Sequence, residues 1–170
     1  MNHLKSCLGA IRALCLWVAI GATLVLFGVV AFNIFGRAVF DTTGGDVNLM
    51  IFGAIELSQY ALMISIFAAI PAMLGVGLIR VDILRSQFPA WLQKAADRLW
   101  LALIACVAAV LFLAFFDFAH TALERGDQTQ DLRWPLWPFY GFAALECAAL
   151  ALLAGAEALG IQTTPDEAPA

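Results

Sequence analysis

The sequence contains little charge. Asp, Glu, Lys and Arg make up 13% of its 170 residues, against about 25% in an average soluble domain. The nine Lys and Arg residues are scattered and the net charge is −4, which argues against the concentrated basic surface of a nucleic-acid-binding protein. Glycine-rich phosphate loops, GxSxG elbows and HExxH motifs are also missing. Their absence removes the usual signatures of nucleotide-dependent enzymes, serine hydrolases and zinc proteases.

Cysteine and histidine are rare and poorly placed for binding a metal or a cofactor. The four cysteines form no CxxC pair and are Cys7, Cys15, Cys106 and Cys147. A free Cys in an apolar run behaves as a small buried hydrophobe. The two histidines, His3 and His120, fall on opposite sides of the membrane in the topology derived below, whereas a bis-His haem needs two ligands that converge on one iron. We therefore expect no metal, no cofactor and no enzymatic activity.

Apolar residues dominate the sequence instead. Hydrophobic residues make up 63% of the chain and the mean hydropathy is +0.89, which is typical of an integral membrane protein. Backbone polar groups in lipid must be satisfied within their own segment, so apolar runs of about 20 residues predict membrane-spanning helices. We expect an all-α, four-helix membrane protein with one domain over residues 1–161 and a disordered tail over 162–170. The expected spans are residues 13–36, 50–79, 99–121 and 134–156.

The distribution of basic residues predicts the orientation of these spans, because cytoplasmic loops are enriched in Lys and Arg. Six basic residues fall on the side that holds both termini and the loop between spans two and three: Lys5, Arg12, Arg80, Arg85, Lys94 and Arg98. Three fall on the opposite side: Arg37, Arg125 and Arg133. We therefore expect both termini to lie in the cytoplasm.

A short amphipathic helix is expected on the cytoplasmic surface between spans two and three, over residues 89–99. Pro89 is favourable at a helix N-terminus. Apolar residues that include Trp91 and Leu92 recur with helical period opposite polar residues that include Lys94 and Asp97. This pattern is typical of a helix that lies in the membrane interface and leads into the next span.

Apart from Asp117 at the wet end of span three, two carboxylates fall inside the expected spans, where a charge is tolerated only with a partner and is a default candidate for function. Glu56 lies near the outer end of span two, at the level of Arg37 on span one. The simpler interpretation is a structural ion pair between Arg37 and Glu56. An ion-coupling carboxylate is one alternative, and docking of a partner or solvation at the lipid headgroups are two others.

Glu146 lies deeper in the membrane, about 18 Å below Trp134 at a rise of about 1.5 Å per residue. Thr23 of span one and Ser65 of span two are expected at a similar depth. The simpler interpretation of Glu146 is a protonated carboxyl group that donates a hydrogen bond to a hydroxyl or carbonyl group. A proton relay and a contact with another subunit are the alternatives.

Small residues in span two are candidates for packing against a neighbouring helix, since helices in lipid associate through close backbone approach. Ala68, Ala72 and Gly75 are of this kind. We expect Ala72→Leu to weaken pairing with a partner subunit while leaving membrane insertion intact. Part of the small-residue surface must serve the chain's own bundle, and the sequence does not say which part.

Several short motifs, taken in order over roughly residues 13–158, resemble the small membrane subunit of TRAP (tripartite ATP-independent periplasmic) transporters, the DctQ-like family. Span one ends in an Arg-aromatic segment at residues 36–40 (GRAVF), and span two opens with Glu56. Span two is followed by residues 80–83 (RVDI), and Leu78 stands where the family has a histidine. Residues 135–138 (PLWP) match the segment that precedes the family's fourth span.

This resemblance implies a protein that works through partners rather than as a catalyst. It implies a one-to-one complex with a large membrane subunit that holds the substrate and sodium sites, and a periplasmic binding protein that delivers an organic acid. The small subunit then braces the large one among the lipids of a bacterial inner membrane and helps to dock the binding protein. The residues expected at structural or interface positions are Arg37, Glu56, Ala72, Gly75, Arg80, Asp82 and Glu146.

Three other functions stay open at the level of sequence. The small subunit of a tripartite tricarboxylate transporter is similar in size and role. A membrane redox anchor needs converging His or Cys ligands, and a membrane enzyme needs a polar cluster at one membrane face. The transported substrate is not readable from this chain, because the residues that select it lie on the partners.

Overall fold

The computed structural model describes residues 2–74 and 89–161. They form four helices: α1 (Asn2–Thr42), α2 (Ala54–Ala72), α4 (Ala90–Arg125) and α5 (Trp137–Ala158). Within these ranges the one pairing of extended backbone is an isolated bridge between Gln128 and Pro135. The expected all-α fold is confirmed, and all four helices are long and apolar enough to cross a membrane. The expected disordered tail, residues 162–170, lies outside the described residues.

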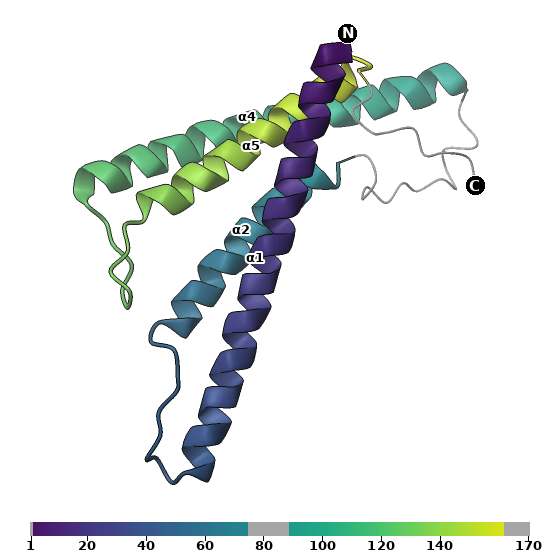
Figure 1. Ribbon diagram of the computed structural model, residues 1–170. Helices are drawn as coiled ribbons and strands as arrows, with labels where there is room; N and C mark the ends of the chain where they lie inside the picture. Colours follow the sequence, from purple (N-terminus) through teal and green to yellow (C-terminus); the bar gives the residue numbers. More distant parts are fainter. Residues whose placement is uncertain (1, 75–88, 162–170) are drawn as a thin grey trace, which may run out of the picture.

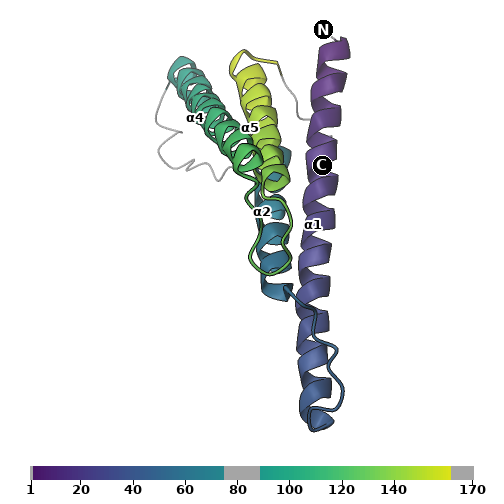
Figure 2. The same cartoon turned by 90° about the vertical axis from the view of Figure 1, so that its left-hand side faces the viewer.

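The helices are arranged as two hairpins set at an angle to each other (Figure 1). In one hairpin α1 packs along α2, and in the other α4 packs along α5. The hairpins meet mainly through α2 and α5, with a smaller contact between α1 and α5. In the view turned by 90°, α5 lies between α4 and α1 (Figure 2). Helix α5 is therefore the most enclosed of the four described helices.

The helices differ widely in length. The 41 residues of α1 span about 61 Å and the 36 residues of α4 about 54 Å, whereas the hydrocarbon core of a bilayer is about 30 Å thick. The 19 residues of α2 span about 28 Å. This helix ends at Ala72, with Pro71 in its last turn rather than at a kink within a longer span. The two long helices must therefore tilt in the membrane or extend beyond it.

The separate amphipathic helix expected over residues 89–99 does not form as an element of its own. Ala90 begins a single continuous helix that ends only at Arg125. The physical reason is that no Gly or Pro occurs between these two residues, so nothing breaks the helix where its amphipathic part meets its apolar part. Gly126 caps the helix with a left-handed φ of 67°, and Asp127 N–H then donates to Ala122 O over 3.0 Å, as in a Schellman motif.

The interior of the fold is built from small side chains. Ala68 and Ala72 of α2 have 0% and 5% of their surface exposed, and Ala143 and Ala154 of α5 are completely enclosed. Ala72 packs with Cys15 of α1 and with α5. Because this surface of α2 is used inside the chain, it is not free for a partner. Ala72 therefore belongs to the part of the small-residue surface that serves the chain's own bundle, and the effect of Ala72→Leu on pairing with a partner subunit stays a prediction.

Candidate functional site

Glu56 lies in the first turns of α2 and holds the connection between α4 and α5. Its Oε1 accepts the backbone N–H of Gln130 over 2.8 Å, and its Oε2 accepts that of Leu132 over 2.9 Å. The partners are more than 70 positions away in the sequence. One carboxylate thus uses both oxygens to fix the backbone of a loop in the other hairpin.

Arg37 is not the partner of Glu56, and the expected Arg37–Glu56 ion pair is absent although both side chains belong to the described part of the chain. The reason is that α1 runs past the start of α2 (Figure 1). Gly36 lies against the backbone of the α1–α2 loop, where a Cβ atom on Gly36 would come within 3.1 Å of Leu49. Arg37 is therefore at the level of the loop rather than of Glu56, and it is exposed.

The α4–α5 connection, residues 126–136, is held together by hydrogen bonds within the loop. Thr129 N–H donates to Trp134 O over 2.8 Å, and Trp134 N–H donates to the Thr129 hydroxyl over 3.0 Å. At the base of the loop, Leu136 N–H donates to Asp127 O over 3.0 Å. Thr129 is consequently buried, with 5% of its surface exposed. Sequence reasoning missed this loop, because its turn residues do not show which helix will hold it.

A close packing contact complements the hydrogen bonds of Glu56. Gly53 precedes α2 with a φ of 70°, and a Cβ atom there would come within 2.7 Å of Leu132 Cγ. The Tyr60 ring of α2 stacks on the Phe139 ring of α5, with 4.0 Å between their centroids. The start of α2, the loop and the start of α5 therefore form one packed unit at this end of the molecule.

Glu146 lies near the middle of α5 and has 1% of its surface exposed. Its carboxyl group is beside the Cys15 thiol of α1. In the described part of the chain neither of its oxygens has a hydrogen-bond partner of good geometry. The hydroxyl groups expected near it bond to each other instead: Thr23 and Ser65 are 2.6 Å apart.

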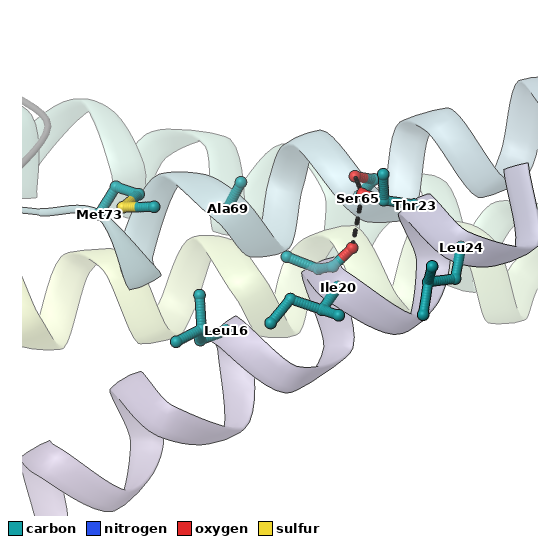
Figure 3. A pocket seen from close by; sticks show the side chains of 8 residues that line it. Leu16, Ile20, Thr23, Leu24, Ser65, Ala69 and Met73 are labelled. Carbon is teal, nitrogen blue, oxygen red and sulfur yellow. Dashed lines mark hydrogen bonds between the residues drawn. The ribbon is translucent and has the colours of Figure 1, made fainter. Parts of the chain in front are cut away.

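Thr23 and Ser65 lie on the floor of a groove between α1 and α2 (Figure 3). Thr23 donates to Ala19 O over 2.7 Å, so the Ser65 hydroxyl supplies the proton of the bond between them. The groove has a volume of about 270 Å³, and its walls are mainly apolar, with Leu16 on α1 and Met73 on α2. Because its hydroxyl groups satisfy each other, the groove suits a hydrocarbon better than a polar solute.

Arg12 joins α1 to the end of α2. Its Nε donates to Ala72 O over 2.8 Å and its Nη2 to Leu74 O over 2.6 Å. A helix leaves its last carbonyl groups without partners and carries partial negative charge at that end, so a guanidinium group fits there. The sequence showed Arg12 only as a basic residue before span one. A signal for its role was its position at the start of an apolar run, where a charge needs a partner.

The remaining expected residues fall outside what the structure describes. Gly75, Arg80 and Asp82, together with Leu78, lie in the segment 75–88 that separates the described ranges. Among the described residues, no group of three His, Cys, Asp or Glu side chains is arranged to hold a metal ion.

Comparison with protein families gives a match over most of the chain. Residues 26–163 match the family model described as tripartite ATP-independent periplasmic transporters, DctQ component. Curated proteins and solved structures give no match. The matched range covers most of the chain, from the middle of α1 to the end of α5. It therefore includes Glu56, the loop that Glu56 holds and Glu146, and the chain belongs to the DctQ family, the small membrane component of TRAP transporters.

Proposed function

We propose that this chain is the scaffold subunit of a TRAP transporter, bracing a large transport subunit in a one-to-one complex. The observation that carries the proposal, beside the family match, is the distribution of side-chain size over the fold. Small residues fill the interior, and large apolar residues face outward. Helices in lipid associate by close packing rather than by a hydrophobic drive, so the chain holds itself together internally and keeps a broad apolar exterior for a partner.

The exterior is apolar on both hairpins. Trp17 and Phe27 of α1 have 72% and 68% of their surface exposed, and Val110 and Leu113 of α4 have 66% and 65%. The two hairpins lie at an angle to each other (Figure 1). Their apolar exterior is thus spread over both hairpins, and a large subunit can pack against it as a fixed reference. Membrane lipids cover the part that the large subunit leaves free, including the groove between α1 and α2.

Family membership supports the further details of this proposal. The large subunit holds the substrate and sodium sites, and sodium-coupled uptake of an organic acid begins when a periplasmic binding protein docks on the pair. The chain lies in the bacterial inner membrane with both termini in the cytoplasm, as its basic residues favour. The family match supports this function over a tripartite tricarboxylate transporter subunit, a redox anchor or a membrane enzyme.

The scaffold function is tested by reconstitution. The chain is expressed alone and with the large subunit, purified, and placed in liposomes with the binding protein and a sodium gradient. We expect the pair to co-purify one-to-one and to transport, and the isolated chain to insert without transporting. Transport by the isolated chain, or failure of the two subunits to co-purify, contradicts the proposal.

The partner-facing surface is located with a tryptophan scan of exposed positions. Leu24, Val25 and Phe32 of α1, and Leu103 and Val110 of α4, sample both long helices. Tryptophan at a lipid-facing position is tolerated, whereas at a packed interface it loosens the pair. We expect co-purification to fall along one face and to stay unchanged along the others. A scan with no effect at any position argues against an interface on these helices.

The proposed orientation is tested with reporter fusions. A fusion after Ala170 is expected to report the cytoplasm, and one within residues 126–131 the periplasm. The reverse pattern overturns the orientation and the side assigned to each loop.

A further inference from the structure

The groove between α1 and α2 is held in shape by polar contacts of the chain itself. On its floor the hydroxyl groups of Thr23 and Ser65 are 2.6 Å apart, and Thr23 donates to Ala19 O over 2.7 Å. One helical turn before the first groove residue of α1, Arg12 donates to Ala72 O and ties α1 to the end of α2. These contacts fix the spacing of the two helices along the groove.

The walls of this groove are apolar and exposed. Leu16, Ile20 and Leu24 come from α1, and Met73 comes from α2 (Figure 3). Ile20 has 42%, Leu24 67% and Met73 51% of its surface exposed. Both helices are long and apolar enough to cross a membrane, and the two hydroxyl groups on the floor bond to each other. The groove therefore offers a hydrocarbon a surface to pack on and offers a polar solute no free partner.

The depth of the groove matches one leaflet of a bilayer. No charged residue occurs between Arg12 and Arg37, so Arg12 marks the point where the apolar part of α1 begins. At a rise of about 1.5 Å per residue, Leu16 lies about 6 Å and Leu24 about 18 Å from Arg12 along the helix. One leaflet contributes about 15 Å of hydrocarbon, half of about 30 Å. The groove thus covers the depth that one acyl chain covers.

The surface of α1 beyond the groove carries only positive charge. Lys5 and Arg12 are seven residues apart and Leu16 follows four residues later, so all three lie on one face of the helix. No Asp or Glu precedes Asp41 in the chain. The Nε and Nη2 groups of Arg12 already donate to α2, so Arg12 adds positive charge, whereas the exposed Lys5 can direct its ammonium group to a ligand. The mouth of the groove therefore favours an anion.

We propose that the groove between α1 and α2 binds one acyl chain of an anionic phospholipid, with the lipid phosphate at the mouth between Arg12 and Lys5. A chain in the groove restores dispersion contacts that an unfilled groove lacks. Bulk lipid chains are as apolar as the walls, so the preference for one lipid class comes from the charge at the mouth. The inference rests on the membrane location that the proposed function assigns to α1 and α2, and not on the partner subunits.

The groove is tested with Ala69→Leu, which places a branched side chain on its α2 wall. Thermal unfolding of the full chain is measured in neutral detergent, without lipid and with phosphatidylglycerol. We expect the lipid to raise the unfolding temperature of the wild type, because a ligand that binds only the folded state stabilises it. Ala69→Leu should lose this rise, and the matched control Ala31→Leu, beyond the groove on α1, should keep it. Ile20→Trp closes the groove from α1 and decides the question if Ala69→Leu does not fold.

The charge at the mouth is tested by comparing lipids with the same chains. The wild type should bind phosphatidylglycerol more tightly than phosphatidylcholine, and it should not respond to glycerophosphoglycerol, which is the same headgroup without chains. Lys5→Gln should lower this preference about fivefold, which corresponds to the roughly 1 kcal/mol that one Lys contributes near an anionic surface. Lys94→Gln makes the same charge change at the start of α4 and should leave the preference unchanged.

The lipid that stays bound is counted by native mass spectrometry, for the chain alone and for its complex with the large subunit. We expect both to retain phosphatidylglycerol, and both to lose it with Ala69→Leu or Ile20→Trp. An equal rise in unfolding temperature for these variants and the wild type would place the lipid elsewhere and overturn the site. Equal binding of phosphatidylglycerol and phosphatidylcholine would overturn the role of the charge.

The measurements on the complex separate this inference from the proposed function. If phosphatidylglycerol binds the chain alone but is displaced when the large subunit assembles, the partner fills the groove, so the lipid site is wrong and the scaffold function stands. If the chain binds phosphatidylglycerol with the expected variant effects but does not assemble with the large subunit, the proposed function fails and the lipid site stands.

Discussion

Arg12 and Ala72 are joined across the first hairpin: the Nε of Arg12 donates to the carbonyl oxygen of Ala72 over 2.8 Å. A second bond from the same guanidinium reaches Leu74 O. The last carbonyl groups of α2 would otherwise lack partners, because the helix ends there. A basic residue in α1 thus stabilises the end of α2 and, through it, the junction with α5.

We predict that Arg12→Met destabilises the fold by about 2 kcal/mol or more, since hydrogen bonds to charged groups contribute about 1.5–3 kcal/mol each. Arg12→Lys should recover only part of the loss, because an ammonium group lacks the planar fork that serves two carbonyls. Thermal unfolding of the purified subunit in detergent measures both. The control is Lys5→Met on the exposed side of α1; equal effects of Lys5→Met and Arg12→Met would show that only charge matters.

Replacing the buried carboxyl group of Glu146 is expected to stabilise the fold, in contrast to replacing Arg12. It is enclosed beside Cys15 and has no hydrogen-bond partner of good geometry among the described residues. Replacing an unsatisfied buried polar group with an apolar one of similar shape is often neutral or stabilising. We predict that Glu146→Met raises the unfolding temperature and leaves transport by the complex intact. Loss of transport with normal assembly would instead assign Glu146 to a proton relay.

Overpacking of the α2 interior tests the small-residue core. Ala68 is completely enclosed, and extra methylene groups in a packed core typically cost about 1–3 kcal/mol. We predict that Ala68→Leu lowers the stability of the subunit on its own, before any partner is added. Ala31→Leu on the exposed side of α1 is the matched control and should change little. If Ala68→Leu affects only co-purification, this surface faces the partner after all.

Alanine substitutions at two glycines with nearly the same backbone conformation distinguish the cost of backbone strain from the cost of a steric clash. Gly53 and Gly126 have φ values of 70° and 67°. A Cβ atom on Gly126 meets nothing within 4 Å, whereas one on Gly53 overlaps Leu132. Gly126→Ala should cost about 1 kcal/mol from left-handed strain alone, and Gly53→Ala should cost more. In a double-mutant cycle, Leu132→Ala should reduce the cost of Gly53→Ala; strict additivity would show that the contact carries no energy.

The local elements of this protein follow from its sequence. The all-helical fold comes from continuous apolar runs of about 20 residues, because a helix satisfies its backbone groups within one segment, whereas a closed barrel needs short strands of alternating polarity. The sequence also contains the reason for the continuity of α4, because no residue between Ala90 and Arg125 breaks a helix. The change from an amphipathic to an apolar pattern suggested two helices, but such a change does not interrupt the backbone. The order of short motifs was enough to indicate the family.

The partners of the polar residues were decided only by the tertiary structure. Glu56 could be placed near Arg37 by depth, but its bonds go to amides more than 70 positions away. Arg12 binds carbonyl groups about 60 positions away, and Ala72 faces inward rather than outward. Periodicity along one helix fixes which residues share a face, whereas the helix that covers that face depends on how two hairpins meet. That arrangement comes from the packing of small residues between helices, and it cannot be inferred from the residue pattern of each helix taken alone.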